Sequence, residues 1–204
     1  MTQIIFDIFQ PKHARMHEVL GASADSFALA LASRLKGAVM WVRPNWAEGG
    51  LNPLGLNDFY DPSQVLVSIT PSHTQALAVA EEALREKAVA LVVIEILQPI
   101  DLTAGRRLQL AAKAGGTTGL ALVQDGMGSL STETRWRCTP VFDANDSTLQ
   151  HWELIKNKTG TLGSWHVRWD RTARSMFVVS PPGKRADFAP QTHQRPLRTD
   201  TKAE

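Results

Sequence analysis

Cysteine is nearly absent from this chain of 204 residues, since Cys138 is the only one. A disulfide framework and a cysteine metal site are therefore excluded, and a reducing, cytoplasmic environment is expected. Long hydrophobic runs are absent too: the longest, residues 89–97, contains Glu95 and is far shorter than the roughly 20 residues that span a bilayer. The apolar residues 4–9 have no basic segment ahead of them, unlike a signal peptide. We expect no membrane association.

Charge of either sign is not in large excess, because the formal net charge is +2. The distribution is uneven, however: residues 1–150 contain 12 basic and 15 acidic side chains, and residues 151–204 contain 10 and 5. A basic C-terminal third is compatible with an acidic partner such as nucleic acid. A solvated basic tail explains the same charge equally well.

Short β-type runs alternate with helical patterns from residue 18 to residue 124, which predicts a mostly parallel sheet flanked by helices. The expected strands are residues 18–20, 38–43, 65–69, 89–97 and 118–124. Asp25, Ser72 and Asp101 are expected to begin the three helices between them. Residues 44–64, rich in proline and glycine, read as a long surface excursion.

The helical signal fades after residue 130, and successive β-type segments predict an antiparallel C-terminal extension. They are residues 135–142, 151–157, 164–169 and 175–179. In the third, Trp165 and Trp169 share one face while His166 lies on the other, as in a half-buried strand.

The expected organisation is one α/β core at residues 15–180, preceded by an N-terminal segment at residues 1–14. Residues 181–204 contain four prolines and few large apolar side chains. This composition predicts a disordered tail.

Residues 21–28 lie between a strand and a helix, where a phosphate-binding loop of the form G-x-x-x-x-G-K-[ST] would occur. Gly21 is present, but Ser26 replaces the second glycine. Phe27 replaces the lysine that neutralises the phosphates, and Ala28 replaces the hydroxyl that holds magnesium. We therefore predict that the chain is not an ATPase, that it binds no nucleotide or metal cofactor, and that Phe27 is buried.

Two weaker catalytic patterns have simpler structural explanations. Ser23 stands at the centre of a near nucleophile elbow, but the fifth position is Asp25 rather than glycine, and the spacing of Asp143 and His151 identifies no triad. Glu95 ends an apolar strand where nucleotide hydrolases place a magnesium-handling acid. A carboxylate that caps a neighbouring helix or faces solvent is the more frequent explanation.

Two binding patterns also have structural alternatives. His13 and His17 are four residues apart, as on a metal-binding helix, but a strand at residues 18–20 spoils that geometry. Six tryptophans invite a base-stacking hypothesis, above all Trp136 between Arg135 and Arg137. Packing in a core or interface is favoured.

Several of these segments resemble the RecA-like recombinase core over roughly residues 15–180. Residues 18–21 correspond to the strand that enters the RecA phosphate loop, residues 89–95 to its second acidic strand, and residues 119–124 to the strand that ends in a polar residue. Residues 153–158 (ELIKNK) are similar to the recombinase strand that ends in Lys-Asn-Lys, here with Lys156 and Lys158. The resemblance implies a RecA-like fold of the P-loop NTPase type.

The chain departs from the recombinase pattern outside these strands. The two DNA-binding loops are compressed into residues 98–105 and 125–134. Only about a dozen residues precede Arg15, where recombinases carry the segment through which they polymerise. These departures favour a truncated homologue that does not use nucleotide.

The sequence also resembles ImuA-type proteins at residues 15–19 (RMHEV), 41–44 (WVRP), 134–137 (TRWR) and 152–158 (WELIKNK). The resemblance implies a non-catalytic adaptor of the SOS response to DNA damage. Such an adaptor joins an ImuB-type homologue of Y-family polymerases to an error-prone DNA polymerase in mutagenic translesion synthesis. Expected partner or DNA contacts are charged or aromatic residues at loops and strand ends: Arg106, Arg107, Arg135, Trp136, Arg137, Lys156 and Lys158.

Two other functions stay open at this point. One is a single-stranded DNA binder that regulates RecA filaments. The other is an enzyme that uses Ser23 as a nucleophile or a cryptic nucleotide site.

Overall fold

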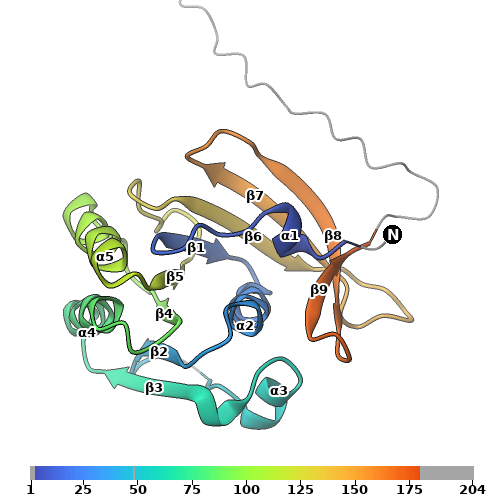
Figure 1. The fold of residues 1–204 in the computed structure, drawn as a ribbon, viewed down its shortest axis with the longest axis horizontal. Helices are drawn as coiled ribbons and strands as arrows, with labels where there is room; N and C mark the ends of the chain where they lie inside the picture. The colour runs from blue at the N-terminus through green and yellow to red at the C-terminus, as the bar shows by residue number, and fades with distance from the viewer. Residues whose placement is uncertain (1–2, 48, 180–204) are drawn as a thin grey trace, which may run out of the picture.

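A nine-stranded sheet runs through the computed structural model, which describes residues 3–47 and 49–179 (Figure 1). The strands are β1 (Met16–Leu20), β2 (Val39–Pro44), β3 (Val65–Thr70), β4 (Leu91–Glu95), β5 (Thr118–Leu122), β6 (Thr134–Pro140), β7 (Gln150–Asn157), β8 (Gly163–Asp170) and β9 (Ser175–Val178). The helices are α1 (Ile5–Ile8), α2 (Ala24–Leu35), α3 (Pro53–Asn57), α4 (His73–Arg85) and α5 (Leu102–Gly115), with a 3₁₀ turn, η1 (Pro62–Gln64).

The strand order is β3-β2-β4-β5-β1-β6-β7-β8-β9. Every neighbouring pair from β3 to β6 is parallel, and the pairs from β6 to β9 are antiparallel. This arrangement confirms the predicted α/β class, with a mostly parallel sheet and an antiparallel C-terminal part, and it is consistent with a RecA-like fold.

Helices cover both faces of the parallel half, which is why its inner strands β4, β5 and β1 are almost entirely buried. Helices α4 and α5 lie on one face and α2 on the other (Figure 1). Successive side chains of β1 alternate between the two cores: Val19 packs on the α2 side, whereas Met16 and Leu20 pack on the α4 and α5 side. β1 is thereby buried along its whole length.

The antiparallel half shares the core on the α2 side. Trp136, Trp152 and Trp165 project from β6, β7 and β8 into this core, and the predicted alternation along β8 is confirmed. The N-terminal residues join them, because Ile5 and Phe6 of α1 are buried in the same cluster. The predicted N-terminal segment thus packs on this core through α1. Burying each such side chain contributes roughly 1.5–3 kcal/mol.

Helix caps agree with the sequence at two of three positions. The side chain of Ser72 accepts from the amide of Gln75 at the start of α4, and that of Asp101 accepts from the amide of Ala104 at the start of α5. At α2 the cap is Ser23 rather than Asp25, because the strand–helix turn is shorter than expected. Asp25 lies in the first turn, where its negative charge favours the positive end of the helix.

Residues 44–64 are more structured than a surface excursion, since they contain α3 and η1 and bury Leu56 and Tyr60. At the outer edge of the sheet, β3 leaves Leu66 and Ile69 exposed. No helix in the described ranges is long and apolar enough to cross a membrane. The predicted tail at residues 181–204 lies outside the described residues.

Candidate functional site

The turn between β1 and α2 occupies the position of a phosphate-binding loop, but it is only three residues long. Gly21 has a φ of +98°, and a Cβ there would collide with the carbonyl oxygen of Cys138 on β6. That same carbonyl accepts the amide of Ser23 at 3.1 Å, and the amide of Ala24 bonds the carbonyl of Gly21 at 3.0 Å. Two backbone donors of the turn, the amides of Ser23 and Ala24, are thus paired inside the protein.

Phe27 is fully buried, as predicted. Its ring centroid lies 4.7 Å from that of Trp152, 5.3 Å from that of Trp136 and 5.6 Å from that of Phe6. The side chain that replaces the phosphate-binding lysine therefore points into the core on the α2 side, away from the carboxyl ends of the parallel strands.

Those carboxyl ends surround a cavity of about 240 Å³, lined by Asp25, Arg43, Glu95 and Gln124 among others. In open parallel sheets this edge is the usual place for a ligand. The carboxylate of Glu95 accepts from Trp41 Nε1 at 2.7 Å and lies 3.5 Å from the Arg43 guanidinium. Burial nevertheless raises the pKa of Glu95. Both of its oxygens are engaged by β2, so the acid ties β4 to its neighbour.

The predicted nucleophile elbow does not gather a triad. Ser23 is buried at the start of α2, and its amide is bonded to Cys138. His151 bonds the Ser164 hydroxyl at 2.6 Å across β7 and β8, while Asp143 accepts the amides of Asn145 and Asp146. The three groups have separate structural partners.

The two histidines considered as metal ligands also separate. His13 is exposed and His17 is fully buried. Within the described ranges, no group of three or more His, Cys, Asp or Glu side chains is arranged to hold a metal ion.

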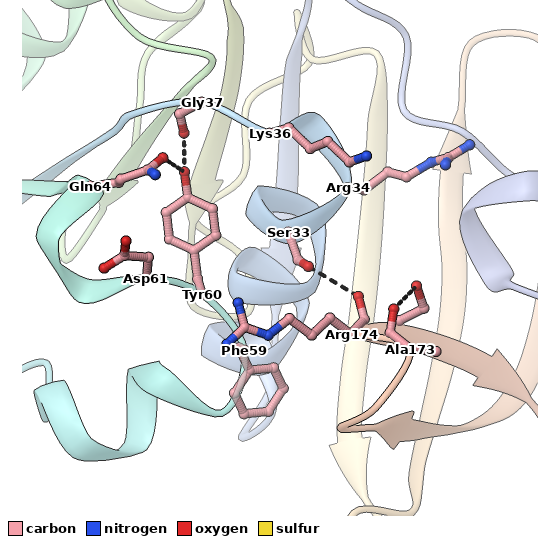
Figure 2. A pocket seen from close by; sticks show the side chains of 11 residues that line it. Ser33, Arg34, Lys36, Gly37, Phe59, Tyr60, Asp61, Gln64, Ala173 and Arg174 are labelled. Atoms are coloured by element: carbon pink, nitrogen blue, oxygen red, sulfur yellow. Dashed lines mark hydrogen bonds between the residues drawn. The ribbon is translucent and has the colours of Figure 1, made fainter.

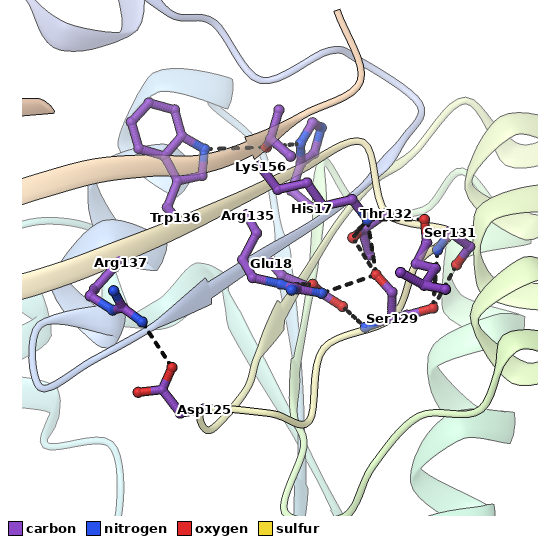
Figure 3. Close-up of polar contacts among 12 residues, drawn as sticks. His17, Glu18, Asp125, Ser129, Ser131, Thr132, Arg135, Trp136, Arg137 and Lys156 are labelled. Atoms are coloured by element: carbon purple, nitrogen blue, oxygen red, sulfur yellow. Dashed lines mark hydrogen bonds and ion pairs between the residues drawn. The ribbon is translucent and has the colours of Figure 1, made fainter. Parts of the chain in front are cut away.

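A buried charge organises the other side of the sheet (Figure 3). Glu18, in the middle of β1, is 0% exposed, and its carboxylate pairs with Arg135 Nε at 2.6 Å. Its second oxygen accepts the amide of Ser129 at 2.6 Å, and the Arg135 guanidinium donates to the Ser129 carbonyl at 3.0 Å. A buried carboxylate needs such partners, because an unpaired one is strongly unfavourable.

The two lysines of the ELIKNK segment turn toward the same loop. Lys156 Nζ donates to the carbonyls of Ser129 and Leu130 at 3.0 and 2.9 Å, and Lys158 Nζ to that of Ser131 at 2.6 Å. Burial lowers the pKa of Lys156. The loop that follows β5 is thus fastened from β1, β6 and β7, and we call residues 125–133 the clamped loop.

The structure sorts the seven predicted contact residues into two groups. Arg135, Lys156 and Lys158 hold the clamped loop, and Trp136, which is 1% exposed, lies in the core on the α2 side. The other three have exposed guanidinium groups: Arg106, Arg107 with an ion pair to Glu81 at 2.6 Å, and Arg137 with an ion pair to Asp125 at 2.9 Å.

Sequence reasoning missed Glu18 and the serines of the clamped loop. The signal was present, because a carboxylate inside the apolar run Met16–Leu20 must find a cation or several donors. Gly105 on α5 was also missed, because its role appears only in the folded structure. A Cβ there would collide with the hydroxyls of Ser129 and Ser131. That close approach sets the clamped loop directly against α5.

The chain is an α/β protein, consistent with a RecA-like fold, in which the turn between β1 and α2 is hydrogen-bonded to β6. No family model matches the chain. It is similar to Protein ImuA of Caulobacter vibrioides, in the strains NA1000 / CB15N and ATCC 19089 / CIP 103742 / CB 15. Each match has 32% identity over 145 residues and covers 62% of this chain and 57% of the relative.

The chain therefore spans little more than half the length of the curated relatives that it matches. Over the matched part, the similarity confirms the resemblance to ImuA-type proteins.

Replacing Glu18 by Gln should lower the free energy of unfolding by about 3 kcal/mol, because the substitution leaves the Arg135 cation without its buried counter-ion. Urea unfolding measures this loss. The matched control is Glu153→Gln, since Glu153 lies 3.8 Å from Arg137 with both side chains about 40% exposed. The control should change stability by less than about 0.5 kcal/mol. Equal losses in the two variants would contradict the structural role of Glu18.

His17 should make stability depend on pH. Its Nε2–H donates to the carbonyl of Lys12 at 2.9 Å, and Nδ1 accepts from the Thr134 hydroxyl at 2.7 Å, which fixes the neutral tautomer. Burial lowers the pKa of His17 to about 4, whereas a histidine in the unfolded chain has a pKa of about 6.5.

Stability should therefore fall as the pH drops from about 6.5 to about 4, by up to about 3 kcal/mol from this residue. The His17→Gln variant should lose less stability over the same interval. Urea unfolding at pH 7.0 and 4.5 measures both slopes, and identical slopes would rule out His17 as the source.

Proposed function

We propose that this chain is a non-catalytic adaptor of the ImuA type in damage-induced mutagenic translesion DNA synthesis. In this role it contacts an ImuB-type homologue of Y-family polymerases and an error-prone DNA polymerase. The similarity to Protein ImuA supports the pathway. The observation that carries the adaptor role is the closed β1–α2 turn, in which a core carbonyl takes the amide that a phosphate would need.

Three structural features support the proposal that the chain does not hydrolyse ATP. Phe27 contributes no charge and is directed into the core. The only glycine of the turn, Gly21, leaves just enough room for the Cys138 carbonyl. Glu95, the acid that would handle magnesium, is held by Trp41 and Arg43. Without charge compensation or a metal ligand, a triphosphate in this turn would lose its hydration and gain no compensating interaction.

The surface best suited to a polymerase partner combines α5 with the clamped loop. Leu102 and Leu110 on α5 and Leu130 at the loop tip are 45%, 64% and 78% exposed. Arg106 and Arg107 lie on the exposed side of the same helix. Exposed leucines beside arginines are typical of protein interfaces, in which arginine is enriched. Because the loop is fastened to three strands, Leu130 is presented with little loss of conformational freedom on binding.

Co-purification with recombinant partners tests this role. The ImuB-type protein and the error-prone polymerase of the same organism should be retained by the full chain. Leu110→Asp and Leu130→Asp should each weaken retention at least about tenfold, a change of roughly 1.4 kcal/mol. Leu54→Asp is the matched control, because Leu54 is an equally exposed leucine on α3 and should retain the partners.

Failure to retain either partner would contradict the proposal. Nuclease treatment of the samples separates direct contact from DNA bridging. Loss of the complex after this treatment would favour the alternative of a single-stranded DNA binder.

ATP with magnesium should leave the thermal unfolding of the chain unchanged. A ligand that binds only the folded state stabilises it by RT ln(1 + [L]/Kd), so even weak binding raises the melting temperature. A nucleotide-binding recombinase measured in parallel serves as the positive control. A magnesium-dependent rise that Glu95→Gln abolishes would establish a cryptic nucleotide site and overturn this part of the proposal.

A further inference from the structure

A second cavity lies at the amino ends of the parallel strands, on the edge opposite to the β1–α2 turn. Its volume is about 610 Å³, within the range of small-molecule sites. Three segments distant in sequence form it: residues 33–37 at the end of α2, residues 59–64, and residues 173–175 between β8 and β9 (Figure 2).

Three hydrogen-bond acceptors of the cavity wall are used within the protein. The carbonyl of Gly37 accepts from the Tyr60 hydroxyl, and that of Arg174 accepts from the Ser33 hydroxyl at 3.0 Å. One carboxylate oxygen of Asp61 accepts the amide and the hydroxyl of Ser63 at 2.9 and 2.8 Å. The other oxygen of Asp61 is the acceptor, and Asp61 the negative charge, that the wall keeps.

The donors and positive charges of the wall are less occupied. Among the described residues, the Lys36 ammonium has no hydrogen-bond or ion-pair partner. The guanidinium of Arg174 donates one long hydrogen bond, 3.4 Å to the carbonyl of Asn57, and it also faces Asp61, whose pKa is lowered by the hydrogen bonds from Ser63 and further by the Arg174 charge. The side-chain amide of Gln64 contacts the Tyr60 hydroxyl at 3.1 Å. The wall is therefore suited to a group that accepts hydrogen bonds and carries negative charge.

The backbone itself places the two cations. Lys36 and Arg174 have φ angles of 52° and 46°, in the left-handed region that residues other than glycine seldom adopt. Within the described ranges only two other non-glycine residues, Ala14 and Lys87, share this conformation. Unfavourable backbone of this kind concentrates at ligand sites. Both residues line the cavity, Lys36 at the end of α2 and Arg174 between β8 and β9.

An aromatic ring completes the wall. Phe59 is half-buried and packs on Trp169 with the ring centroids 4.6 Å apart and an interplanar angle of 31°. Figure 2 shows the Arg174 side chain extending from the β8–β9 turn toward this ring. The remaining face of a supported aromatic ring can stack against a flat group, and cations beside it can hold an attached anion.

From this cavity we infer a binding site for a small organic anion in which a phosphate or a carboxylate is joined to a flat ring. Lys36 and Arg174 supply the positive charge that attracts the anionic group, and the ring lies against Phe59. Arg34 on the same wall is already paired with Asp7 at 2.8 Å and adds only a distant positive charge. The site is independent of the surface formed by α5 and the clamped loop.

Isothermal titration calorimetry with 1-naphthyl phosphate and 1-naphthoate tests the site, and the two probes distinguish a phosphate from a carboxylate ligand. At least one should bind saturably, and more weakly as salt is raised from 50 to 500 mM, because screening acts on exposed charges. Inorganic phosphate and 2-naphthol, which lack the ring and the anion respectively, should bind at least about tenfold more weakly than the better probe.

The variants Lys36→Asn and Arg174→Asn remove the charge, and asparagine tolerates the left-handed backbone better than most residues. Each should weaken the better probe at least about tenfold. Lys87→Asn is the matched control, because Lys87 is also exposed at a positive φ of 57° but lies outside the cavity. Its affinity should equal that of the unmodified chain, and all three variants should keep its melting temperature within a few degrees.

Three results would overturn the inference. The first is the absence of saturable binding by both probes. The second is equal weakening in Lys36→Asn and Lys87→Asn. The third is binding of 2-naphthol as tight as that of the anions, which would make the cavity a purely apolar one.

Discussion

The buried carboxylate of Glu18 is the constraint that fixes the clamped loop and the exposed Leu130 within it. A charge at the centre of a sheet must be paired, and Arg135 on the adjacent strand supplies the cation. Pairing alone leaves one oxygen, which the amide of Ser129 fills, so the loop after β5 cannot move away. Lys156 then satisfies the carbonyls that this loop turns inward. A single buried acid in β1 thus determines where Leu130 stands on the outside.

The opposite face of the sheet rests on packing rather than charge. Phe27 joins α2 to Trp136 and Trp152, and so connects the parallel and antiparallel halves. This contact draws the start of α2 against β6, close enough for the Cys138 carbonyl to bond the Ser23 amide. A lysine in place of Phe27 would have to leave this core to reach a phosphate. The side chain at the position of the phosphate-loop lysine therefore packs the interface between the two halves.

Much of the fold follows from local pattern. β-branched runs, turn residues and the Ser72 and Asp101 caps locate the strands and helices, and period-two alternation identifies the buried face of β8. The burial of Phe27 was predictable because a large apolar side chain at a helix start needs a core. Asp25 was misjudged as a cap because sequence gives only an approximate length for the β1–α2 turn.

The candidate site was harder to predict, since the presence of a charged residue at a strand end does not indicate the direction of its side chain. Lys156 and Lys158 look like surface cations in sequence, yet carbonyls of a loop more than twenty residues away accept from both. The cavity beside α2 was also invisible, because it forms from three segments that only the folded chain brings together. Pairing across such distances is a property of topology, which a local pattern does not encode.

Cys138 has a practical consequence beyond its place in the core. It is the only cysteine of the chain, its side chain is fully buried, and burial raises the pKa of its thiol well above the usual value. The reactive thiolate is therefore scarce and shielded from reagents in the folded state. A cysteine introduced at an exposed position can therefore be labelled selectively by maleimide chemistry while Cys138 is kept.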